Sequence, residues 1–172
     1  MSIKTQSVYT KKRLIKFNNY VVKSKKLLWI MMSVSTVLII ACLIFQACTG
    51  GIADTVKYSA MFLGFLDVFY LFISFILPHI TLPKSKTLNA KIQCTFNEYG
   101  FDLRVVCKNF DETSAVRYPT LVKIVKNGDD IYLFIASNQA FITSIEGLAD
   151  EDVATLKELL GNAINKKNFI WR

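Results

Sequence analysis

Two long hydrophobic runs dominate the first half of the chain. Residues 27–49 carry no charged side chain, and residues 58–80 carry only Asp67. Each run is 23 residues long, and about 20 apolar residues in a helix cross the roughly 30 Å hydrocarbon core of a bilayer. The pattern therefore predicts a hairpin of two transmembrane helices, joined by a short external loop at residues 50–57.

The pattern changes after Leu82-Pro83, which break the second helix. Residues 81–90 are predicted to be a linker, and from Lys91 onward short β-prone runs alternate with turn residues. The predicted strands are 91–96, 101–107, 114–118, 121–126, 131–136 and 140–145, with turns at 97–100, 109–113 and Asn127-Gly128. Residues 131–136 are apolar on both faces, which is typical of a central strand.

The end of the chain predicts one amphipathic helix. Acidic residues at 150–152 stand at its start and lysines at 166–167 at its end, as the helix dipole favours. Its apolar stripe consists of Val153, Leu156, Leu160 and Ile164. Strands followed by one helix indicate a small α+β domain at residues 91–172, with the antiparallel half-barrel of a pleckstrin-homology-like (PH-like) fold. We expect residues 86–172 to fold alone as a soluble monomer.

The first 26 residues form a basic N-terminal segment. Residues 3–9 alternate apolar and polar side chains and can form a short strand, and Thr10 offers an N-cap for a helix over residues 11–23. Two interpretations of that helix stay open. It is either an amphipathic helix that lies along lipid headgroups, or the first transmembrane helix continuing out of the membrane.

The net charge of +8 lies entirely ahead of the first hydrophobic run. Residues 1–26 hold eight basic and no acidic side chains, and three further lysines closely follow the second run. By the positive-inside rule both termini are cytoplasmic, and the basic residues are expected to contact anionic lipid rather than nucleic acid. These membrane-surface residues are Lys11, Lys12, Arg13, Lys16, Lys23, Lys25 and Lys26. A hydrophobic content of 52% and a mean hydropathy of +0.35 fit a membrane protein.

Residue types that carry catalysis or bind metals are sparse. His79 is the only histidine, the cysteines at 42, 48, 94 and 107 form no C-x-x-C pair, and no Gly-rich phosphate loop is present. We expect no metal, no cofactor and no enzymatic activity, and we expect free thiols in the cytoplasmic domain. The first hydrophobic run is also longer than the apolar region of a cleaved signal peptide.

One face of the second hydrophobic run is small and polar. Its residues are Ala60, Gly64, Asp67 and Ser74. Asp67 falls near mid-membrane, where a carboxylate costs about 2.5 to 3.5 kcal/mol on insertion scales, so its side chain should face protein. We favour a helix–helix contact, with Ser33 or Thr36 of the first helix as partner. The alternative is a proton-linked or ion-linked site.

Several hydrophobic motifs resemble the YcxB-like family of bacterial membrane proteins. In the C-terminal half they are Tyr118-Pro119-Thr120-Leu121 with Ile124, Ile131-Tyr132-Leu133-Phe134 and Ala140-Phe141-Ile142. In the N-terminal half they are Tyr9-Thr10, Phe17-Asn18-x-Tyr20 and Ser24-Lys25-Lys26. Thr143-Ser144 replaces the family's usual Pro-Lys. The resemblance covers nearly the whole chain, and it implies a PH-like cytoplasmic domain on a two-helix anchor in the bacterial cytoplasmic membrane, with no established biochemical activity.

The leading hypothesis for function is a membrane-anchored, non-enzymatic binding protein. Its PH-like domain would hold a protein segment, by strand addition at the open edge of the barrel, or contact anionic lipid. One alternative is a small subunit or regulator of a membrane transport complex, with Asp67 packed against the partner's helices. Another is an immunity-type protein that neutralises a membrane toxin.

Overall fold

The computed structural model describes residues 2–50, 54–84, 87–108 and 110–171. Its contacts divide the chain into two units, one of residues 15–84 and one of residues 1–14 with 85–172, so that the division falls within the first helix. Residues 51–53 of the predicted loop, 85–86 of the predicted linker and Asn109 of a predicted turn lie outside the described residues.

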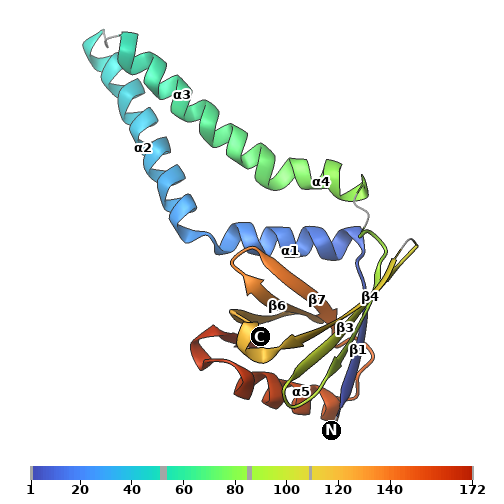
Figure 1. The fold of residues 1–172 in the computed structure, drawn as a ribbon. Helices are drawn as coiled ribbons and strands as arrows, with labels where there is room; N and C mark the ends of the chain where they lie inside the picture. The colour runs from blue at the N-terminus through green and yellow to red at the C-terminus, as the bar shows by residue number, and fades with distance from the viewer. Residues whose placement is uncertain (1, 51–53, 85–86, 109, 172) are drawn as a thin grey trace. The chain divides into compact units, whose positions relative to one another are not determined.

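The elements are labelled in chain order (Figure 1). They are β1 (Ile3–Val8), α1 (Lys11–Ser24), α2 (Lys26–Thr49), α3 (Asp54–Leu71), η1 (Phe72–Ile76), α4 (Leu77–Thr81), η2 (Leu82–Lys84), β2 (Lys91–Phe96), β3 (Gly100–Cys107), β4 (Phe110–Arg117), η3 (Tyr118–Thr120), β5 (Lys123–Asn127), β6 (Asp130–Ala136), β7 (Gln139–Ser144), α5 (Asp150–Ala163), η4 (Lys166–Asn168) and β8 (Phe169–Trp171).

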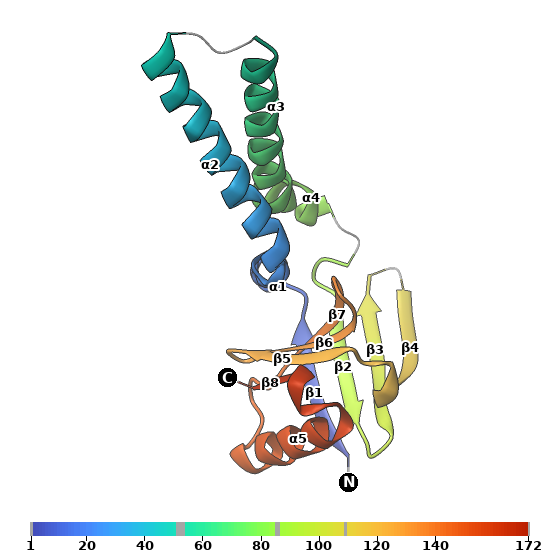
Figure 2. The ribbon, with the colours of Figure 1, turned by 90° about the vertical axis from the view of Figure 1, so that its left-hand side faces the viewer.

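Residues 15–84 contain a hairpin of two long apolar helices, as predicted. Helices α2 and α3 lie side by side (Figures 1 and 2). The rings of Trp29 and Phe75 lie 6.4 Å apart between centroids, so the start of the first helix meets the end of the second. The segments Lys26–Cys48 and Val56–Thr81 are 23 and 26 residues long and are apolar enough to cross a membrane by length and composition.

The second helical run contains a π-helical turn, η1, between α3 and α4. The Leu77 N–H donates to the Phe72 carbonyl, five residues back. Pro78 explains this turn, because it has no N–H to donate to the Ser74 carbonyl and its ring crowds that carbonyl. The widened turn relieves the crowding and lets the helix continue to Thr81.

Helix α1 is separate from α2, which argues against the interpretation of residues 11–23 as a continuation of the first transmembrane helix. Lys25 lies between the two helices with φ −80° and ψ 68°, outside the helical region. The Trp29 indole N–H donates to the Val22 carbonyl over 3.2 Å, across this break. The first transmembrane-length helix therefore does not simply continue into α1.

The other unit contains two four-stranded sheets, in the orders β1-β2-β3-β4 and β7-β6-β5-β8. Strand β1, which precedes the helical hairpin, pairs antiparallel with β2, which follows it, from Ile3 opposite Phe96 to Val8 opposite Lys91. The predicted domain of residues 91–172 therefore omits one strand of its own sheet. Residues 86–172 likewise lack β1, the strand that pairs with β2.

Helix α5 and both sheets enclose the core. Leu156 and Leu160 of α5 are fully buried against apolar residues of both sheets. The most central strand is β6, whose first five residues are all buried and which lies between β5 and β7, as predicted.

Three predictions for this unit are wrong. Helix α5 ends at Ala163 rather than at lysines 166–167, and the chain then returns as β8. Because β8 pairs parallel to β5, the fold neither ends in a helix nor is fully antiparallel. Residues 110–113, predicted to be a turn, begin β4.

Candidate interaction sites

The predicted membrane-surface residues do not behave alike. Lys11, Lys12, Lys23, Lys25 and Lys26 are exposed, whereas Lys16 is half-buried and makes an interaction of its own.

The guanidinium of Arg13 is held within the β-sheet unit. Its Nε lies 3.0 Å from the Asp130 carboxylate, whose side chain is only 6% exposed, and its Nη2 lies 2.7 Å from the Glu146 carboxylate. Nη2 also donates to the Ser144 hydroxyl over 3.1 Å. A buried carboxylate needs such a partner, so Arg13 is a structural residue and its assignment to the membrane surface is corrected.

Polar side chains join the two sheets where β1 meets β7. The hydroxyls of Thr5 and Thr143 hydrogen-bond to each other, and the Ser7 hydroxyl donates to the Ile142 carbonyl over 3.0 Å. The Ile142 N–H donates to the Tyr9 hydroxyl over 3.2 Å. This polar seam (Thr5, Ser7, Tyr9, Ile142, Thr143) fixes the N-terminal strand against both sheets.

The seam holds its titratable groups in their neutral forms. Burial raises the pKa of the Tyr9 hydroxyl to about 12, although its hydrogen bond from the Ile142 N–H opposes the rise. Burial likewise raises the pKa of the Cys94 thiol to about 11, against hydrogen bonds with Thr143 and Thr5. A thiol with a raised pKa is a poor nucleophile, so Cys94, which borders the seam, is suited to packing.

The predicted polar face of the second hydrophobic helix lies partly against α2. Ala60, Gly64 and Asp67 are half-buried, and Ser74 is buried. A Cβ added at Gly64 would lie 3.7 Å from Ile39 Cδ1, so the small residue permits a close approach of the helices. The Asp67 Oδ2 atom is enclosed and has no hydrogen-bond partner among the described residues.

The predicted partners of Asp67 are wrong. The Ser33 hydroxyl donates to the Trp29 carbonyl and the Thr36 hydroxyl to the Met32 carbonyl, each over 2.9 Å. Both hydroxyls are thus satisfied by the preceding turn of their own helix, as serine and threonine often are in apolar surroundings.

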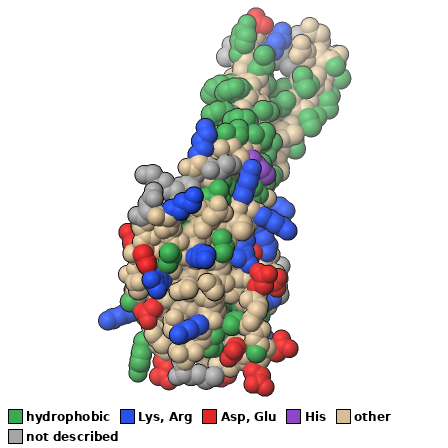
Figure 3. All heavy atoms as spheres, turned by 90° about the vertical axis from the view of Figure 1, so that its right-hand side faces the viewer, with side chains coloured by type: hydrophobic (Ala, Val, Ile, Leu, Met, Phe, Trp, Pro, Cys, Tyr) green, Lys and Arg blue, Asp and Glu red, His purple; other side chains and the backbone are tan. Residues whose placement is uncertain are grey.

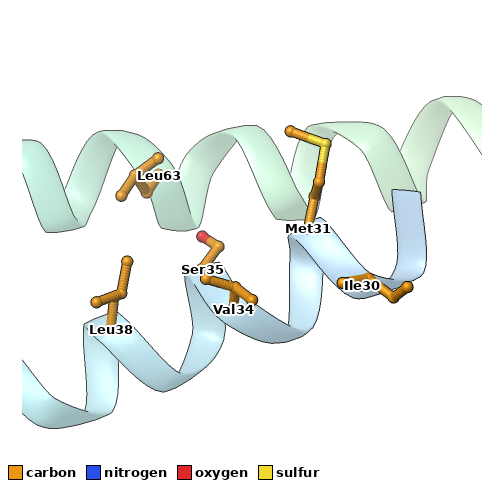
Figure 4. Close-up of a pocket in the computed structure, with 6 residues that line it drawn as sticks. All are labelled: Ile30, Met31, Val34, Ser35, Leu38 and Leu63. Atoms are coloured by element: carbon orange, nitrogen blue, oxygen red, sulfur yellow. The ribbon is translucent and has the colours of Figure 1, made fainter. Parts of the chain in front are cut away.

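An apolar groove runs between α2 and α3, and sequence reasoning did not find it (Figure 4). Its volume is ≈ 290 Å³, and it is lined by Ile30, Met31, Val34, Ser35, Leu38 and Leu63. The Ser35 hydroxyl is enclosed there and, like Asp67 Oδ2, has no hydrogen-bond partner within the described ranges. Hydrophobic side chains also cover the visible face of the hairpin (Figure 3).

Asn18 was also missed, and Pro78 is the signal that could have found it. The Asn18 side-chain amide donates to the Ser74 carbonyl over 2.8 Å. That carbonyl is the one that Pro78 deprives of its helical donor, so a substitute donor had to come from elsewhere in the chain.

Two further observations concern possible metal binding and relatives of this chain. Over the described residues, no three His, Cys, Asp or Glu side chains gather in a way that could hold a metal ion. Comparison of the chain with protein-family models, with curated proteins and with solved structures finds no match. The likeness to the YcxB-like family stays a prediction.

Proposed function

We propose that this protein is a membrane-anchored, non-enzymatic interaction protein that displays its β-sheet unit at the cytoplasmic face of a bacterial cell membrane. The hairpin of α2 and α3–α4 would be the anchor, with both chain termini in the cytoplasm. The lipid bilayer and a protein of unknown identity would be its partners.

One observation carries this proposal, the pairing of β1 with β2. The two strands flank the hairpin in sequence, and they pair over six residues. Tyr9 and Ala90 continue the connection, because the Tyr9 N–H donates to the Ala90 carbonyl over 3.0 Å. A chain that crosses a membrane twice returns to the side from which it started, so a hairpin anchor is compatible with one domain built from both flanks.

The surface of the helices supports a membrane environment. None of the apolar window in Lys26–Cys48 is buried within the protein, and only 6% of that in Val56–Thr81 is. Exposed apolar surface of this extent is unfavourable in water. At 1.5 Å per residue, 23 residues span roughly 35 Å, which is enough for the hydrocarbon core.

The proposed orientation rests on charge. The exposed lysines at 11, 12, 23, 25 and 26 precede α2, whereas the far end of the hairpin offers Asp54 and Lys57, which pair over 3.3 Å. Basic residues favour the cytoplasmic side. The chain order of four strands, three strands and α5 favours the proposed PH-like fold, to which β8 adds a parallel strand after the helix.

Labelling of single cysteines tests this proposal in intact cells. In a variant without the four native cysteines, new cysteines replace the exposed residues Ser2, Asp54 and Asn138, and a membrane-impermeant maleimide is added. We expect labelling only at position 54, and at all three positions after permeabilisation. Labelling of position 138 in intact cells, or equal labelling of 54 and 138, would contradict the proposal.

A second candidate is a subunit or regulator of a membrane transport complex. The enclosed Asp67 and Ser35 oxygens without partners favour it, because an unsatisfied polar group in hydrocarbon is costly and a contact with a further helix could relieve that cost. Co-purification in mild detergent tests it. If a polytopic partner is retained by Asp67→Asn but lost by Asp67→Leu, the residue is a polar packing contact; if both variants lose it, the carboxyl group itself titrates or binds an ion.

A further inference from the structure

Strand β4 is a long edge strand whose protection consists of charged side chains, at Asp111, Glu112 and Arg117. It has eight residues, all paired on one side with β3, and it contains no proline, glycine or lysine. It stands at the end of its sheet, and within the described residues no backbone hydrogen bond reaches its other side. Natural proteins usually shorten, bulge or charge such an edge because it can pair with another strand.

The exposure of β4 shows that no described residue of its own unit covers the middle of the strand. The five residues from Asp111 to Ala115 are all exposed, so both faces of the strand reach solvent over its middle. Val116 and Phe110 at its two ends are half-buried. The backbone of residues 111–115 is therefore accessible for pairing with another strand.

Charge complementarity indicates what the edge fits. Asp111 and Arg117 point to the same face, since they are six residues apart in a strand, and Ser114 lies midway between them. In an antiparallel pair, residues directly opposite each other share a face. If two copies of β4 pair about a two-fold axis at Ser114, Asp111 of each copy lies opposite Arg117 of the other.

In each copy, the Asp111 and Arg117 side chains are available for contacts in this register. The Arg104 guanidinium of β3 binds Asp111 through two contacts of 2.9 and 2.6 Å, and this lowers the pKa of the carboxyl group. The Arg117 guanidinium is exposed and makes no hydrogen bond or ion pair with any described residue. A carboxylate can accept from two guanidinium groups, so Asp111 can bind both Arg104 and the second copy's Arg117.

We propose that β4 pairs with β4 of a second copy of this chain, antiparallel and with Ser114 on the two-fold axis. The β1-β2-β3-β4 sheets of the two copies then form one continuous sheet across the dimer. In this register no like charges lie directly opposite, because Glu112 faces Val116 of the second copy. Anchoring of both copies in one membrane, which rests on the proposed function, would raise their effective concentration, but the strand pairing itself does not depend on it.

Disulfide trapping in the full-length protein tests both the partner and the register. In the variant without native cysteines, Ser114→Cys is oxidised with copper phenanthroline in isolated membranes and examined on a non-reducing gel. Opposed residues in a sheet have Cα atoms about 4.5 to 5.5 Å apart, within disulfide range. We expect a reducible dimer at position 114. The matched control is Ser137→Cys, which changes an exposed serine of the same unit outside β4 and should stay monomeric.

A pair of neighbouring positions fixes the register. Thr113 of one copy should lie opposite Ala115 of the other, so a mixture of Thr113→Cys and Ala115→Cys chains should cross-link. Either variant alone places its cysteines about 8 Å apart, beyond the roughly 7 Å limit for a disulfide. Efficient trapping of Thr113→Cys alone, or no dimer at any β4 position, would overturn the proposal.

Charge reversal gives a second readout that does not change the trapped residue. Arg117→Glu in the Ser114→Cys background should lower the cross-linking yield about three- to tenfold, because two attractive pairs become repulsive. Lys157→Glu, the same charge change at an exposed position of α5, should leave the yield unchanged. If instead Ser114→Cys is trapped to a different protein, the edge binds that protein and the second copy is the wrong occupant; the proposed function would still stand.

Discussion

Replacement of Ile3 by alanine should destabilise the β-sheet unit, although Ile3 precedes the helical hairpin and most of the unit follows it. Ile3 is 6% exposed and belongs to the core formed with Phe96 and Phe101. Truncation of a buried isoleucine to alanine costs about 2 to 5 kcal/mol. Because β1 is the outermost strand of its sheet, we expect about 2 to 3 kcal/mol, which is a large part of the 5 to 15 kcal/mol typical of a domain.

The test uses a soluble form of the unit. Residues 2–14 are joined to residues 87–172 by a flexible Gly/Ser linker of about twelve residues. The junction is feasible because Tyr9 exchanges hydrogen bonds with Asn89 and Ala90, each 3.0 Å long. Urea unfolding is followed by the fluorescence of Trp171, since the other tryptophan, Trp29, is absent from this form.

The control is Lys4→Ala, a change at the next position, whose side chain is exposed on the opposite face of β1. It should alter the free energy of unfolding by less than about 0.5 kcal/mol. Equal effects of Ile3→Ala and Lys4→Ala would refute the assignment of β1 to this unit. The form without residues 2–14 should be less stable than either variant; equal stability would restore the original expectation that the C-terminal part folds alone.

Three further predictions concern polar contacts. Arg13→Gln removes the cation from buried Asp130 and should cost about 3 kcal/mol of unfolding free energy in the same urea assay, whereas Lys12→Gln should cost almost nothing. Because the pKa of Cys94 is raised from 9.0 to about 11 in the folded state, its contribution to stability should be constant below pH 9 and fall by up to about 2 to 3 kcal/mol as the pH rises toward 11. Cys94→Ala should remove the fall between pH 9 and 10, below the range in which the raised pKa of Tyr9 adds its own fall; an unchanged slope there would contradict the burial of the thiol. In the full-length protein in detergent, Asn18→Ala should lower thermal stability by about 0.5 to 1.5 kcal/mol, but much less in a Pro78→Ala background, where the helix supplies its own donor; additive effects would refute the coupling.

Local patterns in the sequence determined most of the elements. The two helices follow from two runs of 23 residues that together carry one charged side chain, because so long an apolar run favours one continuous helix. Strand β6 was predicted with its central place, since a run apolar on both faces has to be covered on both faces. The break at Pro78 and the start of α5 at Asp150 also follow from the properties of single residues.

Only the tertiary structure decided which of these elements belong together. The alternation in Ile3–Val8 indicates a strand, but its partner β2 lies more than 80 residues away and is selected by the complementary surface of the core. The same holds for β8, a three-residue strand whose pairing with β5 depends on the direction in which α5 returns the chain. The basic residue Arg13 looks like its neighbours in sequence, yet its guanidinium meets the buried carboxylate of Asp130. Periodicity records which side of an element is buried, whereas hydrogen-bond and ion-pair partners are determined by residues that only folding brings near.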